Sequence, residues 1–240
     1  MPAEAKKGLV PPDLLLGVAL GGWVVEGGFN GPGQPANNWV RWERSGLAGP
    51  TAGRGHFWEA PEELLDRVAA LGCDAVGLSV EWARLEPEEG RPDEAALERY
   101  ADLLALCRQR GLAPVVTLSY QAHPWWLGEE LWLTPGAPDR FAEHVGRVVP
   151  RLAGSCDRWV TVHQPNRLAL GGWVGGDLPP RRRGAVADGW AAIDNLLTAH
   201  VLAYRAIHRV QPEATVTLDT AASALYDYDG LLVDLLCARH

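Results

Sequence analysis

The residues of this chain that could do chemistry stand where short apolar runs end. Four of them can bind or move a proton or hydrogen-bond a ligand: Glu81, His163, Gln164 and Asp219. A carboxylate beside a histidine can work as a general acid or base, so a His163–Glu81 or His163–Asp219 pair is one hypothesis for the chemistry of this set. Gln164 differs in kind, because an amide cannot give up a proton as a carboxylic acid does.

Each carboxylate also has a structural interpretation. Alternation along its strand places Glu81 opposite the apolar side chains, looking into the mouth of the fold, but an ion pair with Arg84 or another basic side chain would equally explain it. Asp219 could serve as a cap or in a turn. Glu26, in a Glu-Gly step, fits a structural place in a loop better than a catalytic one.

Strand and helix signals alternate along the chain. The expected strands are 14–20, 75–81, 114–118, 159–162 and 214–218, and the expected helices are 61–71, 93–110, 138–152, 186–210 and 230–239. Apolar strands separated by amphipathic helices predict an α/β fold with a parallel sheet covered by helices. Ligands of such folds lie beyond the carboxyl ends of the strands, where the polar residues above fall. Because no Gly-x-Gly-x-x-Gly follows a strand, a nucleotide-binding sheet is the weaker alternative.

Five segments carry motifs in an order typical of one enzyme family. They are Leu15–Gly27, His56–Leu65, Leu71–Pro87, Pro114–Leu127 and Thr161–Asn166, the last reading T-V-H-Q-P-N. Together they resemble glycoside hydrolase family 1, the β-glucosidase clan of (β/α)8 TIM barrels. The resemblance covers essentially the whole chain and implies a barrel of carbohydrate metabolism with its cleft at the strand ends.

The positions that would grip and cleave a sugar in that family have changed. The resemblance implies polar sugar-binding side chains, an arginine and a catalytic glutamate at these positions, where this chain has Val24, Gly77, Tyr120, Gln121, His163 and Gln164. Replacing the acid/base glutamate by Gln164 removes general acid help that is typically ~10²–10⁴-fold. The family's nucleophile lies in a T-E-N-G-like segment, which does not occur in these 240 residues. The resemblance therefore implies the fold and the place of the cleft, but not glucose recognition.

A carbohydrate-like small molecule is the ligand that this mouth is expected to take. The residues expected to contact it are Glu26, Tyr120, Gln121, Trp125 and Asn166. Trp125 and Trp126 border the cleft in the family, so we expect one of them to stack on the ligand and the other to belong to the core.

Composition restricts the partners and the compartment. A net charge of -8 argues against nucleic acid and anionic membrane as partners. No apolar run approaches the ~18 residues of a membrane span, and no signal peptide is evident, so we expect a cytoplasmic protein. The four cysteines lie far apart and fit single buried thiols. No short ligand spacing supports a metal site, and no cofactor is expected.

Length sets the expected domain organisation. The 240 residues fit about five strand–helix units, whereas eight units at the same spacing need about 360 residues or more. We expect one domain over 1–240, an incomplete (β/α)8 barrel that could be the N-terminal part of a longer chain. Its first and fifth strands would be open edges, so we expect a homo-oligomer or a partner domain to cover them.

Two functions follow from these observations and stay open. One is a degenerate, catalytically impaired or inactive β-glycosidase-like domain (a pseudoenzyme) that binds a sugar-like ligand or serves as a partner domain. The other is an active enzyme that uses Glu81, Asp219 and His163 at the barrel mouth and completes its barrel with another chain. The changed positions and the missing late strands favour the first.

Overall fold

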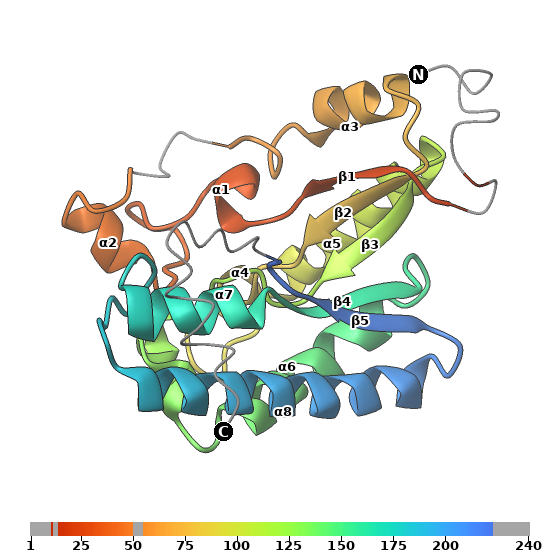
Figure 1. The fold of residues 1–240 in the computed structure, drawn as a ribbon. Helices are drawn as coiled ribbons and strands as arrows, with labels where there is room; N and C mark the ends of the chain where they lie inside the picture. The colour runs from red at the N-terminus through yellow and green to blue at the C-terminus, as the bar shows by residue number, and fades with distance from the viewer. Residues whose placement is uncertain (1–10, 12–13, 50–54, 223–240) are drawn as a thin grey trace, which may run out of the picture.

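The chain folds into one parallel sheet with helices outside it, as the sequence predicts. The computed structural model describes residue 11 and residues 14–49 and 55–222 (Figure 1). The strands are β1 Gly17–Leu20, β2 Ala75–Ser79, β3 Ala113–Thr117, β4 Arg158–His163 and β5 Thr215–Asp219. Each strand pairs in parallel with the next one along the chain, in the order β1-β2-β3-β4-β5. This order is that of successive strand–helix–strand units, which confirms the α/β class and the partial barrel.

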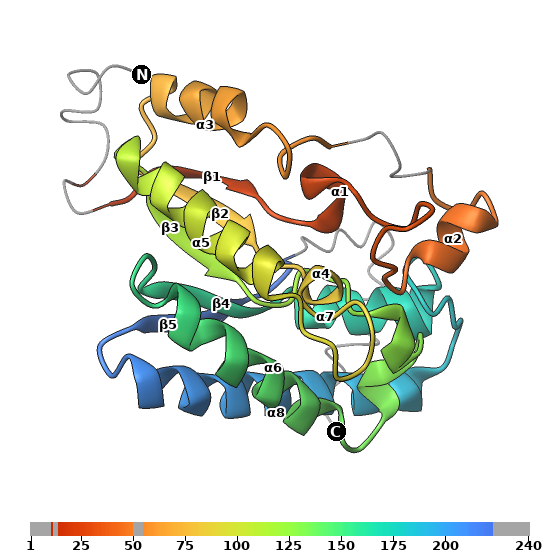
Figure 2. The same cartoon turned by 180° about the vertical axis from the view of Figure 1, so that it is seen from behind.

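Four long helices connect the strands. They are α3 Pro61–Ala70, α5 Glu94–Gln109, α6 Ala137–Leu152 and α8 Val186–Val210. Viewed from behind, α5 and α6 lie in front of the sheet, and α3 and α8 lie beside its two edges (Figure 2). Local signals explain where the helices begin: Pro61 occupies the first turn of α3, and the side chain of Asp93 accepts the backbone N–H of Ala96 to cap α5.

The core lies between the outer face of the sheet and these helices. On β2 the side chains of Val76 and Leu78, followed by Val80, are buried in that core. The alternate residues face inward, toward the side that a closed barrel would enclose. The predicted alternation along this strand is therefore confirmed.

Shorter helices and turns, absent from the elements expected from the sequence, follow several strand ends. They are α1 Trp23–Glu26, α2 Val40–Arg44, α4 Trp82–Leu85, α7 Pro165–Ala169, the 3-10 turns η2 Trp125–Leu127 and η3 Leu131–Leu133, and the π-helix η4 Leu170–Gly175. One helical turn is too short to produce a readable apolar period. In the described part of the chain, no helix has both the length and the hydropathy that crossing a membrane takes.

The boundaries need two corrections. The first strand begins at Gly17 instead of Leu14, because Leu14, Leu15 and Leu16 are exposed and lie outside the ladder with β2. The second ends at Ser79, and Glu81 precedes α4 as its N-terminal flanking residue. The helix expected over 230–239 lies outside the described residues.

Candidate functional site

The carboxyl ends of the five strands lie on the side of the molecule that carries α1, α4 and α7 (Figure 1). We call this region the mouth and define it by Gly21, Tyr120, His163, Gln164 and Asp219. These residues follow or end β1, β3, β4 and β5, so the sheet brings together positions that are far apart in the chain.

His163 and Asp219 form the polar centre of the mouth. Their Cα atoms are register partners on β4 and β5, and His163 Nδ1 lies 2.6 Å from Asp219 Oδ2. The His163 side chain is 15% exposed and that of Asp219 43%, so the pair is open to solvent on one side. With Nδ1 bound to the carboxylate, Nε2 of a neutral His163 is the nitrogen left to accept a proton. Of the two predicted histidine–carboxylate pairs, this is the one that the structure contains.

Gln164 is held by its backbone. Its φ of 49° is in the left-handed region, and its N–H lies 3.1 Å from the carbonyl oxygen and 3.2 Å from Oδ1 of Asp219. Pro165 follows as the first residue of α7. Asp219 therefore binds the last residue of β4 through a ring nitrogen and the residue after it through a peptide N–H.

Tyr120 lies between two partners. One face of its ring stacks on the imidazole of His163, with centroids 4.1 Å apart and planes at 8°. The other face covers Gly21 and Gly22, where a Cβ on Gly21 would come within 2.6 Å of the ring. A continuous series of contacts therefore crosses the mouth. It begins at the glycines after β1 and passes through Tyr120 and His163 to Asp219 on β5. Burial raises the pKa of the Tyr120 phenol, helped by the charges of Asp219 and Glu81.

A second cluster, buried beneath α1 and α4, is built on Glu26 and Arg84. Arg84 Nε bonds Glu26 Oε1 in a buried ion pair, and the guanidinium also donates to the Gly27 carbonyl oxygen at 2.6 Å. The same guanidinium lies over the ring of Phe29 at 4.4 Å and over that of Trp58 at 4.1 Å. Both the charge and the flat face of Arg84 are thus used within the protein.

Glu81 joins this cluster through Tyr100. The Tyr100 hydroxyl donates to Glu26 Oε2 at 2.7 Å and accepts the Glu81 backbone N–H at 3.0 Å. The side chain of Glu81 accepts the Ser79 hydroxyl at 2.7 Å, and that hydroxyl accepts the Gly22 N–H at 2.7 Å. Arg84 therefore pairs with Glu26 instead of Glu81, which corrects the ion pair considered for Glu81.

Burial determines the protonation of both glutamates. It raises the pKa of Glu26 to about 6, although Arg84 and Tyr100 act in the opposite direction. It raises the pKa of Glu81 to about 8, helped by the charge of Glu26 and opposed by Ser79 and Arg84. Glu81 is thus mainly a neutral carboxylic acid at pH 7, and its ionisation would place a second negative charge beside Glu26.

The other expected ligand contacts fall at different places. Glu26 is buried with both oxygens occupied by Arg84 and Tyr100. Asn166 bonds the backbone of Ala221 with both ends of its amide, at 2.7 and 3.0 Å, and so ties the chain after β5 to α7.

The loop after β3 carries the remaining two. Trp125 is 39% exposed, whereas Trp126 donates its indole N–H to the Glu86 carbonyl oxygen at 2.8 Å. Gln121 has a φ of 60°, and its carbonyl oxygen accepts the Trp39 indole N–H at 3.2 Å. Trp125 is therefore the tryptophan of this pair with free aromatic surface.

Sequence reasoning missed Ser79 and Tyr100 as members of a polar cluster. Tyr100 falls within the helix expected over 93–110 and Ser79 within the strand expected over 75–81, and neither position by itself indicates a polar partner. The signal that could have pointed to them is Glu81 itself, because a carboxylate inside an apolar strand end needs buried donors. Within the described residues no group of three or more His, Cys, Asp and Glu side chains could hold a metal ion.

Comparison with known proteins gives relatives that are at least about twice this length. 6-phospho-beta-galactosidase 1 of Streptococcus pneumoniae is 27% identical over 232 residues, which are 96% of this chain and 49% of that protein. Klotho of Homo sapiens is 27% identical over 81% of this chain and 22% of its own length. The chain therefore spans about half, or less, of the length of these curated relatives.

Solved structures agree in fold. A beta-glucosidase from Thermotoga maritima superposes with a TM-score of 0.85 at 21% identity, over 95% of this chain and 53% of that one. A beta-glycosidase from Pyrococcus horikoshii gives 0.76 at 25% identity, over 88% and 48%. The sequence profile of glycosyl hydrolase family 1 matches residues 6–239. With nearly all of its length inside that profile, this chain belongs to glycosyl hydrolase family 1.

Proposed function

We propose that this chain is a glycosyl hydrolase family 1 domain that binds a sugar-like ligand at its mouth without cleaving a glycosidic bond. Gln164 carries the proposal. It stands in T-V-H-Q-P-N at the end of β4, where the family resemblance implies the acid/base glutamate. An amide there can hydrogen-bond a sugar oxygen but cannot protonate a leaving group.

The carboxylates of the described residues near the mouth support the same conclusion. Hydrolysis with retention uses two carboxyl groups about 5–5.5 Å apart that flank the scissile bond. Glu26 and Glu81 are buried and bonded to protein groups, and Asp219 is bonded to His163 and Gln164. None of the three is a free carboxylate facing a ligand across the mouth from a second one.

Trp125 and the His163–Asp219 pair provide the binding surface in this proposal. An exposed indole stacks on the apolar face of a sugar ring, and partly exposed polar side chains bond its hydroxyls. Tyr120 does not serve for stacking, because one face of its ring covers Gly21 and Gly22, which follow β1, and the other covers His163. Tyr120 instead holds His163 in place.

The test combines turnover with binding. We expect no hydrolysis of 4-nitrophenyl β-glucoside or β-galactoside above background, and saturable binding of glucose or cellobiose by calorimetry. Trp125→Ala should weaken that binding, whereas Trp190→Ala, at a 67% exposed position on α8, should not. Turnover that copurifies with the chain would contradict the loss of hydrolysis, and absence of any saccharide binding would contradict the ligand.

A second candidate function rests on one observation, the 2.6 Å contact between His163 and Asp219. A histidine oriented by a carboxylate can act as a general base, so an enzyme with different chemistry could use this pair. Such an activity should be lost in His163→Ala and retained in Gln164→Ala. If the chain binds a sugar without cleaving it, as proposed above, wild type and both variants should all show background turnover.

We also propose that a partner covers the open edges of the sheet. In the described residues β1 and β5 each pair on one side only, and the flank of α8 exposes several large apolar side chains. They are Val186, Trp190, Leu197, Val201 and Tyr204. Exposed apolar surface beside an unpaired strand fits a covering strand–helix unit. Hydrogen exchange tests this: a covered β5 edge should exchange slowly, and fast exchange along β5 in the native assembly would contradict it.

A further inference from the structure

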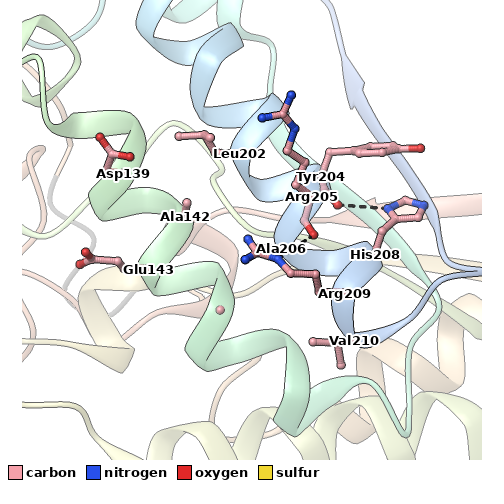
Figure 3. A pocket seen from close by; sticks show the side chains of 11 residues that line it. Asp139, Ala142, Glu143, Leu202, Tyr204, Arg205, Ala206, His208, Arg209 and Val210 are labelled. Atoms are coloured by element: carbon pink, nitrogen blue, oxygen red, sulfur yellow. Dashed lines mark hydrogen bonds between the residues drawn. The ribbon is translucent and has the colours of Figure 1, made fainter.

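A large open groove lies between α6 and α8, in the helix layer and away from the mouth (Figure 3). Its volume is about 1010 Å³. Small side chains form much of its floor, including Ala142 and Gly146 from α6 and Ala206 from α8. The two helices pack closely along their length, so the groove is a shallow channel above their contact line.

The two walls of this groove carry opposite charges. Asp139 and Glu143 lie on the α6 side, and Arg205 and Arg209 lie on the α8 side (Figure 3). Among the described residues, none of these four side chains takes part in an ion pair, whereas Arg140, Arg147 and Arg151 of α6 all do. Arg209 Nε donates to the Arg205 carbonyl oxygen at 3.2 Å, which keeps its side chain along α8.

This arrangement is complementary to itself. A two-fold axis that places two α6–α8 layers face to face puts α8 of one copy over α6 of the other, so each acidic wall meets a basic wall twice. The result is a four-helix bundle whose core is the small-residue floor and the apolar ends of Leu202 and Val210. Two acidic and two basic side chains also make this surface neutral in a chain of net charge -8, so two copies can approach here with little repulsion.

We propose that the groove between α6 and α8 is an interface on which a second copy of this chain docks, with Asp139 and Glu143 of one copy facing Arg205 and Arg209 of the other. The interface is independent of the sugar-binding proposal, because it uses the helix layer and leaves the mouth open. It also leaves β1 and β5 uncovered, so it differs from closure of the sheet edges.

A charge exchange tests the proposal. Light scattering of the purified chain should give the mass of two copies. Arg205→Glu with Arg209→Glu, and separately Asp139→Arg with Glu143→Arg, should each weaken dimerisation roughly tenfold or more, because each places like charges face to face. An equimolar mixture of the two variants should restore the dimer, since every contact then joins opposite charges. Glu62→Arg with Asp102→Arg changes the net charge as much as the second variant, at exposed positions of α3 and α5, and should leave the dimer intact.

Three outcomes would overturn the interface. They are a wild-type mass of one copy throughout a dilution series, a dimer that persists in both reversed variants, and a mixture of two folded variants that stays monomeric. Circular dichroism checks that the variants fold. If either does not, the salt dependence of the wild-type dimer decides, because contacts between exposed charges weaken as salt screens them, and a dimer insensitive to salt contradicts this interface.

Discussion

Asp219 bonds His163, the last residue of β4, and the peptide that follows it: its Oδ2 lies 2.6 Å from His163 Nδ1, and its Oδ1 lies 3.2 Å from the Gln164 nitrogen. One carboxylate therefore orients the ring that faces the mouth and the peptide that starts α7. The register between β4 and β5 is irregular between Val160 and His163, and this irregularity lies next to the residues that Asp219 binds.

Removing that carboxylate should loosen the end of β4. We expect Asp219→Ala to lower the free energy of unfolding by about 1 kcal/mol, discounted for the exposure of the pair. Urea unfolding measures the loss. Asp194→Ala, at an exposed site on α8, should change stability far less. Equal effects of the two substitutions would show that the Asp219 contacts add nothing.

The position of the Tyr120 ring should require a glycine at residue 21, directly after β1. A Cβ on Gly21 would approach the ring within 2.6 Å, so Gly21→Ala must move Tyr120 off His163, at a cost of about 1–3 kcal/mol. Unfolding measures the cost, and NMR should show the His163 ring protons losing the shielding of the stacked phenol. Gly154→Ala, where no atom lies within 4 Å of the added Cβ, is the matched control. Unchanged His163 resonances in folded Gly21→Ala would contradict the stack.

Glu81 should make the protein less stable as pH rises. Its folded pKa of about 8 lies above its ordinary value of 4.5, so the folded state binds more protons between these values and stability falls across that window, then levels off. Glu26, with a pKa of about 6, adds to the fall between pH 4.5 and 6.

Glu81→Gln keeps the size and removes the ionisation. The stability of this variant relative to wild type should therefore increase from pH 5 to pH 8, by an amount on the order of a few kcal/mol. Denaturant unfolding as a function of pH measures it, with Glu62→Gln on the exposed face of α3 as the control. A difference that does not depend on pH would mean that Glu81 is already ionised in the folded protein.

His144 should make the protein less stable as pH falls, whereas Glu81 makes it less stable as pH rises. It is buried against Trp82, with ring centroids 4.6 Å apart, and its Nε2 has no hydrogen-bond partner. Burial lowers its pKa to about 3, helped by Arg147. The unfolded chain then binds the proton first, so the stability that the neutral ring contributes is lost as pH falls below 6.5.

His144→Phe should remove that loss and keep the stack on Trp82. We expect the variant to be more stable than wild type by about 1 kcal/mol at pH 7, because an unpaired polar atom leaves the core, and by more at pH 5. His56→Phe, at an exposed site, should show neither gain. A variant less stable than wild type at both pH values would indicate a hydrogen bond to His144 that the structure does not contain.

Much of the architecture was predictable from local patterns. Strand β3 and helix α8 lie within a few residues of the ranges expected for them, because apolar period and Gly or Pro boundaries are properties of neighbouring residues. The same patterns placed His163, Gln164 and Asp219 at one end of the sheet, since all strands of a parallel sheet point the same way. These local patterns do not indicate whether Glu81 or Asp219 is the partner of His163.

That choice depends on strand register and on which side chains become buried. Asp219 faces His163 because β5 pairs with β4, whereas the side chain of Glu81 is buried and bonded to Ser79. A hydrogen bond across strands is settled by backbone positions that exist only once the sheet has formed.

The family, the order of strands and helices, and the glutamine at position 164 can be read from residue types and their spacing alone. The position of Tyr120 between Gly21 and His163, and the ion pair of Arg84 with Glu26, become visible only in the folded chain. These contacts join residues that are far apart in the sequence, Tyr120 with Gly21 and His163 and Arg84 with Glu26. Their geometry follows from how the sheet curves and what its helices bury, and no local pattern carries that information.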